Sequence, residues 1–282
     1  MSGTVAIVTP AHRARQWLPA CVKSVLAQSY ENWQHWIIAD DGEDYEQLLA
    51  EMGLIDKRQR FRSTGLMGGG ASRTRNVGLG QLDTPYAATL DADDRFKPDK
   101  LARAVQALET HAIVSMAIDE RTPDGTQLRE VGAGADRWLP AGQYKWTNLS
   151  MDSMIVWDRR RCDALYDPDL PNMNDLDFLL RLFAGAEGTW HLGTPLHEYL
   201  KLPQSLSNGA GVTERMIAAK TQILRRLETG FYPMRDPEGA EGMAAFLRIS
   251  IAAEQSYAAA LEERPGLLFE DHLEPMLSAA RR

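Results

Sequence analysis

Short apolar runs alternate with amphipathic stretches through the first 120 residues, and this alternation constrains the fold more than any other feature of the sequence. The apolar runs predict buried strands at residues 5–9, 35–40, 86–91 and 112–118, with a weaker strand at 60–63. Apolar residues at helical spacing lie between them, in residues 18–26, 45–52 and 97–109. Because strand and helix alternate, we expect an α/β fold built from βαβ units, with a mainly parallel sheet flanked by helices.

The later part of the chain has a different pattern. Residues 130–171 follow no regular period, and residues 174–185 then predict a helix. Two long helices with apolar stripes are predicted at 214–228 and 243–263. We expect these stripes to pack against the α/β unit, against another subunit or against a membrane surface.

Composition and charge exclude several classes of protein. The 282 residues carry a formal net charge of −8, which argues against the broad basic surface of a nucleic-acid binder. The two cysteines, Cys21 and Cys162, lie far apart without a CxxC spacing, so neither a disulfide framework nor a zinc ribbon is expected. The short apolar run before Pro10 is too brief for a signal sequence, and no segment approaches a membrane span. We therefore expect a cytoplasmic protein.

Three carboxylates stand within four residues directly after the predicted strand 86–91, in the sequence DADD (the DADD motif, residues 91–94). Like charges this close repel, so they are expected either on a solvated turn or around a cation. Asp91 and Asp93 can together reach Mg²⁺ or Mn²⁺, which keeps positions free for phosphate oxygens. A phosphatase of the haloacid-dehalogenase type is disfavoured because Arg95 stands where that pattern has Thr or Val. The motif alone leaves the turn and the metal site equally open.

Two more polar segments follow predicted strands. Asp40 and Asp41 come after the second strand, where they could accept hydrogen bonds from a base or a ribose or could form an ordinary Asp-Gly turn. In the sequence GGGASRTRN, residues 68–76, glycines permit close backbone approach, and Arg73 or Arg75 could bind phosphate or remain solvated. Because the carboxyl ends of parallel strands share one sheet edge, we expect these segments and the DADD motif to converge there.

Asp175 and Asp177 open the predicted helix 174–185. Acidic residues in a first turn are favoured by the helix dipole whatever their function. Asp175 lies three, four and seven positions before Phe178, Leu179 and Leu182, which share the buried face, whereas Asp177 is turned well away from it. We therefore expect Asp175, and not Asp177, to face the crevice.

The order of these motifs resembles a family 2 glycosyltransferase of the GT-A fold. The resemblance is carried by the opening segment, the Ala-Arg-Asn-like loop, the DXD-like motif, the Glu-Asp-like helix and the closing Tyr-Arg-x-His-x-x-x-Ser-like segment, at residues 5–44, 68–80, 88–94, 172–182 and 197–208. It spans residues 3–208 and does not extend to the C-terminal helices.

The resemblance implies an inverting enzyme of polysaccharide biosynthesis that moves a sugar from a nucleoside-diphosphate donor, a UDP-sugar, to a hydroxyl group with the help of Mn²⁺ or Mg²⁺. By position it implies that the nucleotide pocket contains Thr9, Pro10, Ala11, Asp40 and Asp41. It implies further that Arg75 approaches the diphosphate and that Asp91 contacts the ribose or a metal-bound water. Asp93 is then the metal ligand, with Asp91 beside it, and Asp175 is the catalytic base.

Three positions depart from the family pattern. Asn174 replaces the usual Glu beside the base, while Leu200 and Leu202 replace the Arg and the His of the closing segment. That His is a third metal ligand in some members, and His197 is a candidate substitute. These departures keep open an alternative, a non-catalytic nucleotide-sugar binding module with a GT-A-like fold.

The resemblance also divides the chain. We expect a GT-A catalytic domain at 1–208, with donor binding in about 1–120 and the acceptor side in about 121–208, followed by a helical C-terminal extension at 209–282. The expected acceptor is a saccharide or a lipid-linked saccharide. Without nucleic-acid partners or a transmembrane segment, the protein is expected in the cytoplasm, with a peripheral position at the inner face of the membrane as the alternative.

Overall fold

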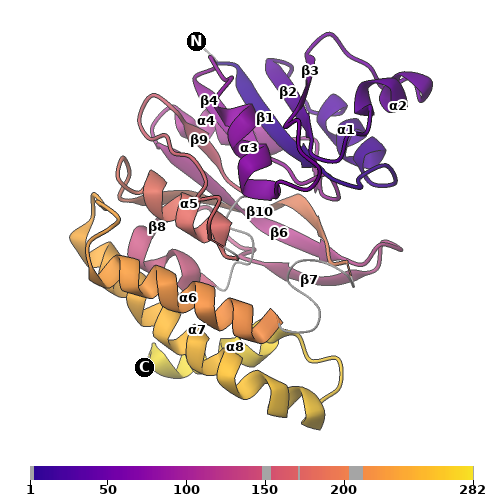
Figure 1. The fold of residues 1–282 in the computed structure, drawn as a ribbon. Helices are drawn as coiled ribbons and strands as arrows, with labels where there is room; N and C mark the ends of the chain where they lie inside the picture. The colour runs from indigo at the N-terminus through magenta and orange to yellow at the C-terminus, as the bar shows by residue number, and fades with distance from the viewer. Residues whose placement is uncertain (1–2, 148–153, 171, 203–211, 282) are drawn as a thin grey trace.

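The computed structural model describes residues 3–147, 154–170, 172–202 and 212–281, and it confirms the α/β fold (Figure 1). One twisted sheet occupies the upper part of the view, and three C-terminal helices form a layer below it. The N-terminal strands pair in parallel in the order β3-β2-β1-β4. They are β1 (Val5–Ala11), β2 (Trp33–Ala39), β3 (Gln59–Ser63) and β4 (Tyr86–Thr89).

The remainder of the sheet is mixed. It continues from β4 in the order β9-β6-β10-β5, and two further strands pair at the side, β7 with β6 and β8 with β10. These strands are β5 (Arg95–Phe96), β6 (Ile113–Arg121), β7 (Gln127–Val131), β8 (Arg137–Pro140), β9 (Val156–Asp158) and β10 (Gly188–Leu200). Since β9 runs antiparallel to both β4 and β6, the parallel arrangement holds within the N-terminal strands and between β6 and β10. The short strands β8 and β9 lie within residues 130–171, where the sequence has no regular period, and they were not predicted.

Helices cover both faces of the sheet because its strands are apolar on both sides. Along β1, Val5 and Ile7 enter one core while Ala6 and Val8 enter the other. The first core takes side chains from α1 (Leu18–Leu26), α2 (Tyr45–Glu51) and α4 (Lys100–Leu108). The second takes side chains from α3 (Ala71–Leu79) and α5 (Asn174–Leu182).

The C-terminal helices belong to this second core. They are α6 (Val212–Glu228), α7 (Pro237–Glu263) and α8 (Phe269–Ala280). Ile223, Leu247 and Leu277 are fully buried in the same apolar cluster as Leu176 of α5. The expected packing of their stripes against the α/β unit is therefore observed. The boundary expected at residues 208 and 209 lies outside the described residues.

A short 3-10 helix, η1 (Ala141–Thr147), joins the extension to the sheet. Gly142 and Gly242 let η1 and α7 approach closely, because a Cβ on Gly242 would lie only 2.6 Å from the carbonyl oxygen of Gly142. Trp146 donates its indole N–H to the Gly242 carbonyl over 3.1 Å. Among the described helices, none combines the length and apolar character that a membrane crossing requires.

Candidate active site

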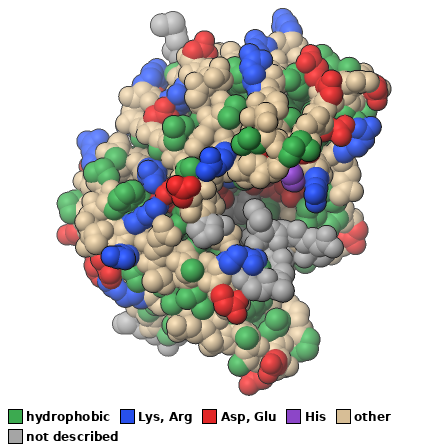
Figure 2. All heavy atoms as spheres, viewed as in Figure 1, with side chains coloured by type: hydrophobic (Ala, Val, Ile, Leu, Met, Phe, Trp, Pro, Cys, Tyr) green, Lys and Arg blue, Asp and Glu red, His purple; other side chains and the backbone are tan. Residues whose placement is uncertain are grey.

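A cavity of about 990 Å³ lies between the carboxyl edge of the sheet and the C-terminal helices. Figure 2 shows this face of the molecule hollowed near its middle, with both acidic and basic side chains close to the hollow. Most of the residues expected at the site line this cavity: Pro10, Ala11, Asp40, Arg75, Asp91, Asp93 and Asp175. Thr9 and Asp41 are not among the lining residues.

Arg75 connects the two sides of the site. This residue of α3 is buried, with 5% of its surface exposed. Its Nη2 donates to Oδ1 of Asp91 over 2.5 Å, and its Nη1 lies 3.3 Å from Oδ1 of Asp175 at the start of α5. Burial opposes the charge of Arg75, but Asp91 and Asp175 together raise its pKa above the ordinary value. The guanidinium therefore stays charged between the DADD motif and α5.

The carboxylates of the DADD motif face different surroundings. Asp93 lines the cavity, and its pKa is raised to about 6 because of burial and of the negative charge of Asp91. Asp94 is buried below the cavity, where its Oδ1 accepts from the Leu200 N–H over 3.0 Å. Asp91 and Asp93 are thus the two carboxylates available to a ligand in the cavity.

His197 lies beneath the DADD motif, in a buried row of polar groups. Its Nε2 is 3.1 Å from Oδ2 of Asp94, and its Nδ1 is 2.8 Å from Nζ of Lys100. Burial lowers the pKa of His197, so the ring is neutral, and the pattern fits a ring that accepts from Lys100 and donates to Asp94. Because both ring nitrogens have protein partners, His197 supports the motif and does not replace the missing third ligand.

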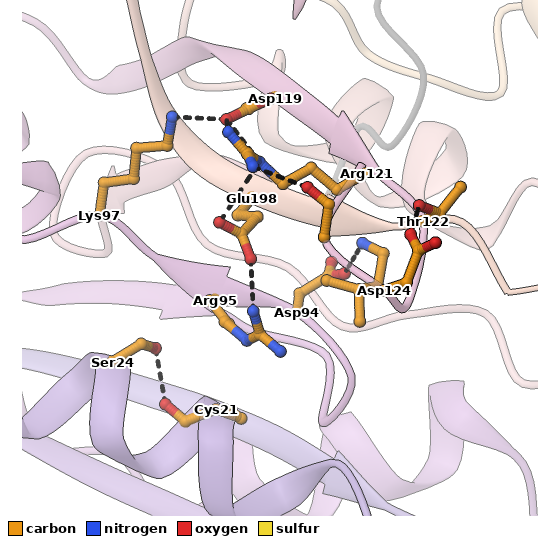
Figure 3. Close-up of polar contacts among 12 residues, drawn as sticks. Cys21, Ser24, Asp94, Arg95, Lys97, Asp119, Arg121, Thr122, Asp124 and Glu198 are labelled. Atoms are coloured by element: carbon orange, nitrogen blue, oxygen red, sulfur yellow. Dashed lines mark hydrogen bonds and ion pairs between the residues drawn. The ribbon is translucent and has the colours of Figure 1, made fainter. Parts of the chain in front are cut away.

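An ion-pair ladder holds the segment after the motif against the sheet (Figure 3). Arg95 of β5 donates to Glu198 of β10 over 2.7 Å, and Glu198 also lies 3.6 Å from Arg121 of β6. Arg121 and Lys97 both contact Asp119, at 2.9 Å and 2.7 Å. The ladder crosses three strands, so it ties the position of the motif to the central sheet.

Asp40 and Asp41 shape the loops around the expected nucleotide pocket. Oδ2 of Asp40 accepts from the Gly70 N–H over 2.9 Å, and its main-chain oxygen accepts from the Gly68 N–H over 2.7 Å. Asp41 accepts from the Arg13 N–H over 2.5 Å and from the Tyr45 hydroxyl over 2.8 Å. These hydrogen bonds outweigh burial and lower the pKa of Asp41. Reading of a base or ribose by either residue stays a prediction.

Thr9 of β1 is buried and does not line the cavity. Its hydroxyl is 2.9 Å from Nε2 of His35, and both residues are completely buried. Burial lowers the pKa of His35 to about 3, so this ring is neutral. Pro10 and Ala11, which follow in the same strand, line the cavity.

One departure from the family pattern, Asn174, has a local explanation. The Asn174 side-chain amide donates to the carbonyl of Leu170 over 2.7 Å and to that of Asp167 over 3.2 Å, and a Glu carboxylate could make neither bond. Leu200 and Leu202 line the cavity with apolar side chains.

Two residues with unusual backbone geometry were missed by sequence analysis. Arg13 and Met173 have φ of 50° and 58°, and they are the only described non-glycine residues with positive φ. Both line the cavity, and Met173 is the residue from which α5 begins. Such conformations cost about 1 kcal/mol or more and collect at binding sites. No residue type at these positions signals them in advance.

Comparisons with known proteins agree with this geometry. The family profile described as Glycosyl transferase family 2 matches residues 6–154, more than half of the chain. A Bacillus subtilis protein assigned by name to teichuronic acid biosynthesis, TuaG, is 26% identical over 72% of this chain and 81% of its own length. An Escherichia coli protein assigned by name to colanic acid biosynthesis, WcaA, is 25% identical over 66% of this chain and 68% of its own. This chain spans about half, 48%, of a Haemophilus influenzae glycosyltransferase that is 27% identical.

Solved structures with low sequence identity share the fold. The crystal structure of S. aureus TarS in complex with UDP-GlcNAc has a TM-score of 0.68 at 12% identity, covering 98% of this chain and 79% of that chain. The mannosyltransferase PcManGT from Pyrobaculum calidifontis, in complex with GDP-Man and Mn²⁺, has a TM-score of 0.58 at 11% identity, covering 100% and 81%. With the profile match and the curated relatives, this likeness shows that the chain belongs to glycosyltransferase family 2 and is a glycosyltransferase with the GT-A fold.

Proposed function

We propose that this glycosyltransferase moves a sugar from a UDP-sugar to a saccharide hydroxyl, with inversion at the anomeric carbon and with the assistance of a divalent cation. The observation that carries the proposal is the meeting of three groups in one cavity: the carboxylates Asp91 and Asp93, the buried cation Arg75 and the carboxylate Asp175. Such a set can hold a charged leaving group on one side and accept a proton on the other.

The comparisons support the class of donor and product. One protein of similar fold contains UDP-GlcNAc and another contains GDP-Man, both of them nucleotide sugars. The names of the two bacterial relatives refer to teichuronic acid and to colanic acid. We extend both features to this chain, as donor class and as a role in polysaccharide biosynthesis.

The residues at the motif fit a divalent cation. Burial and the proximity of Asp91 raise the pKa of Asp93, which indicates negative charge that the surrounding protein compensates only in part. Among the described residues, no group of three or more His, Cys, Asp or Glu side chains is arranged for a metal ion. Mg²⁺ and Mn²⁺ can be held by one or two carboxylates, with phosphate oxygens and water completing the shell. When bound by Asp91 and Asp93, such an ion would neutralise charge on the departing diphosphate.

Asp175 is the proposed general base. It lines the cavity near Arg75, where it can take the proton from the acceptor hydroxyl during in-line attack on the anomeric carbon. Arg75 would hold the Asp175 carboxylate in place and present positive charge toward the diphosphate side.

The test compares Asp175→Asn with a matched variant, Asp169→Asn. Asp169 carries the same charge in the loop before α5, but its side chain is 85% exposed and lies outside the cavity lining. We expect Asp175→Asn to bind UDP as the wild type does while sugar transfer falls about 10²-fold or more, and Asp169→Asn to keep both. UDP binding without turnover in the wild type would instead support the non-catalytic binding module. Transfer by Asp175→Asn at the wild-type rate would remove the assigned base.

A further inference from the structure

A stack of three aromatic rings lies toward the opposite end of strand β10 from the cavity. Trp190 of β10 pairs in register with Trp138 of β8, and His111 lies two residues before β6. The ring centroids of His111 and Trp190 are 4.7 Å apart with an interplanar angle of 8°, and those of His111 and Trp138 are 5.7 Å apart at 29°. Tyr199 of the cavity lining is nine residues further along β10 than Trp190, roughly 30 Å at about 3.3 Å per residue. The stack is therefore separate from the cavity.

Trp138 is the exposed member of the stack. Its surface is 42% exposed, whereas the other six tryptophans of the chain are buried or half-buried. An indole ring is large and mostly apolar, so exposing it beside two further rings creates a continuous aromatic surface. Within the described part of the chain, the hydrogen bonds include none from the indole N–H of Trp138 or Trp190, or to or from the ring nitrogens of His111. Packing alone thus leaves one ring and several polar groups for water or a ligand.

The strand that carries the exposed ring is fixed at both ends. A Cβ on Gly188 of β10 would clash with the carbonyl oxygen of Leu139, so β8 lies this close to β10 only because residue 188 is a glycine. Before β8, Asp136 accepts from the Gly193 N–H over 2.9 Å and from Arg103 of α4 over 2.8 Å. The exposed tryptophan is therefore positioned before a ligand arrives, which lowers the entropic cost of binding.

The stack itself carries no charge near neutral pH. Burial, and after it the nearby positive charge of Arg161, lower the pKa of His111 below its ordinary value, so the ring is neutral. A neutral imidazole offers one N–H donor and one acceptor nitrogen, and each indole adds a donor. A sugar ring complements such a surface, because the C–H groups of its apolar face pack on the negative face of an indole while its hydroxyl groups both donate and accept.

We propose that this stack is a second saccharide-binding site, in which the C–H face of an uncharged sugar unit lies on the ring of Trp138 and its hydroxyl groups meet His111. The inference rests on the proposed function for the choice of a saccharide, since a polysaccharide product can extend to a site remote from the cavity. None of the three rings is among the described lining residues of the cavity, so the site holds a sugar unit that is not reacting. A membrane surface is less suited, because it is met by several protruding aromatic and basic side chains and the stack exposes one ring.

The test follows the indole N–H signals of the ¹⁵N-labelled full chain by NMR while cellohexaose is added. This probe is chosen because its equatorial substituents leave both faces of each glucose unit flat and apolar. We expect the signals of Trp138 and Trp190, assigned with Trp138→Phe and Trp190→Phe, to shift saturably while the other indole signals stay in place. Maltohexaose should bind more weakly, because its axial linkages interrupt the flat face.

Two variants make the result specific. Trp138→Ala should weaken cellohexaose binding about tenfold or more, as for a tryptophan at the centre of a binding surface. Leu128→Ala is the control, since Leu128 of β7 is also exposed, at 40%, but lies outside the stack, and this variant should bind as the wild type does. No saturable shift with either hexasaccharide at millimolar concentration, or unchanged affinity in folded Trp138→Ala, would overturn the inference. Binding to phosphatidylglycerol vesicles that Trp138→Ala abolishes, without saccharide binding, would assign the ring to a membrane surface instead.

Transfer assays separate this inference from the proposed function. Trp138→Ala should transfer sugar to a short acceptor at the wild-type rate, because the stack does not line the cavity. If the wild type binds cellohexaose at the stack but transfers no sugar, the proposed function fails and the second site stands. If it transfers sugar but binds neither hexasaccharide, only the second site fails.

Discussion

Arg75 forms an ion pair with Asp175, in which Nη1 lies 3.3 Å from Oδ1. The two residues come from helices α3 and α5, which are a hundred residues apart in the chain. Because the same guanidinium also binds Asp91, one buried side chain links the DADD motif to the proposed base. We expect this link to produce a coupling between the two sides of the site.

Replacing Arg75 with lysine should break this coupling. A single ammonium group cannot present the planar fork that reaches Asp91 and Asp175 together. Loss of one charge-assisted hydrogen bond costs about 1.5–3 kcal/mol, so we expect kcat/KM to fall about tenfold to a hundredfold. The matched control is Arg73→Lys, because Arg73 lies two residues away with 53% of its side chain exposed. Steady-state kinetics that show equal losses in both variants would contradict the coupling.

The Asp93 carboxylate should make the metal-free protein sensitive to pH. Its pKa in the folded state, about 6, lies above the ordinary value, so the protonated form is stabilised by folding. The contribution to the free energy of unfolding is therefore present at low pH and is lost as pH rises toward and through 6. Mn²⁺ competes with this proton, so its affinity should rise over the same range.

Two variants test this in thermal unfolding experiments at pH 5 and pH 7, with and without Mn²⁺ and UDP. Asp93→Asn should raise the melting temperature of the metal-free protein at pH 7 and abolish the further rise on adding Mn²⁺. The exposed Asp83 gives the control, since Asp83→Asn makes the same charge change away from the cavity. A melting temperature of Asp93→Asn that still responds to Mn²⁺ would place the ion elsewhere.

The convergence of the site could be predicted from sequence because it depends on local order. Asp91 follows a strand, and Arg75 lies in a helix that begins directly after a glycine-rich loop; parallel strands bring such positions to one edge of the sheet. The periodicity of α5 likewise placed Asp175 toward the cavity, since three buried residues fix the inward face.

The contacts that hold the site residues in position could not be predicted from the sequence, because they join residues that are distant in the chain. Lys100 and His197 are 97 positions apart, and no pattern in either segment indicates that they meet. The hydrogen bonds that occupy Asp41 also depend on the tertiary approach of Arg13. One wall of the cavity exists only because α6, α7 and α8 pack against the α/β unit. Periodicity describes one element at a time and carries no information on such contacts.

Asp177 should be required for stability and not for chemistry. It is fully buried and accepts from Arg181 over 2.6 Å, from Arg226 over 2.7 Å and from the Tyr232 hydroxyl over 2.7 Å. Its direction, away from the cavity, agrees with the helical periodicity, but its burial shows that it joins α5 to the C-terminal helices. Asp177→Asn removes the buried carboxylate that Arg181 and Arg226 share, while Asp167 remains as their second acidic partner. We therefore expect a loss of about 1.5–3 kcal/mol in the free energy of unfolding.

Urea denaturation measures that loss, and Asp175→Asn is the comparison. Its side chain is partly exposed, so the same chemical change should alter stability much less. If Asp177→Asn is as stable as the wild type but inactive, the roles of the two aspartates must be exchanged.

His197 should control metal affinity through Asp94, although it does not face the cavity. It joins Lys100 to Asp94, and Asp94 adjoins the proposed ligand Asp93 in the same turn. His197→Phe keeps a ring in the core but leaves two buried polar side chains, Lys100 and Asp94, without the group that bridges them. We therefore expect a loss of about 1–3 kcal/mol in stability for each unsatisfied group. We also expect the affinity for Mn²⁺ to fall, because the DADD motif changes position when this support is lost. The affinity is measured at a temperature at which the variant is folded.

The control for this prediction lies in the same strand. His191 of β10 is also completely buried, and its ring contacts Ser115 at 3.0 Å and the Gly132 carbonyl at 2.8 Å, away from the DADD motif. His191→Phe should therefore destabilise the protein through unsatisfied buried groups while leaving Mn²⁺ affinity unchanged. Calorimetric titration of Mn²⁺ into the UDP complex of each variant measures this affinity. A loss of affinity in both variants would show a general effect of destabilisation and would contradict the prediction. A loss confined to His197→Phe is expected if Lys100, His197 and Asp94 together position the metal-binding turn.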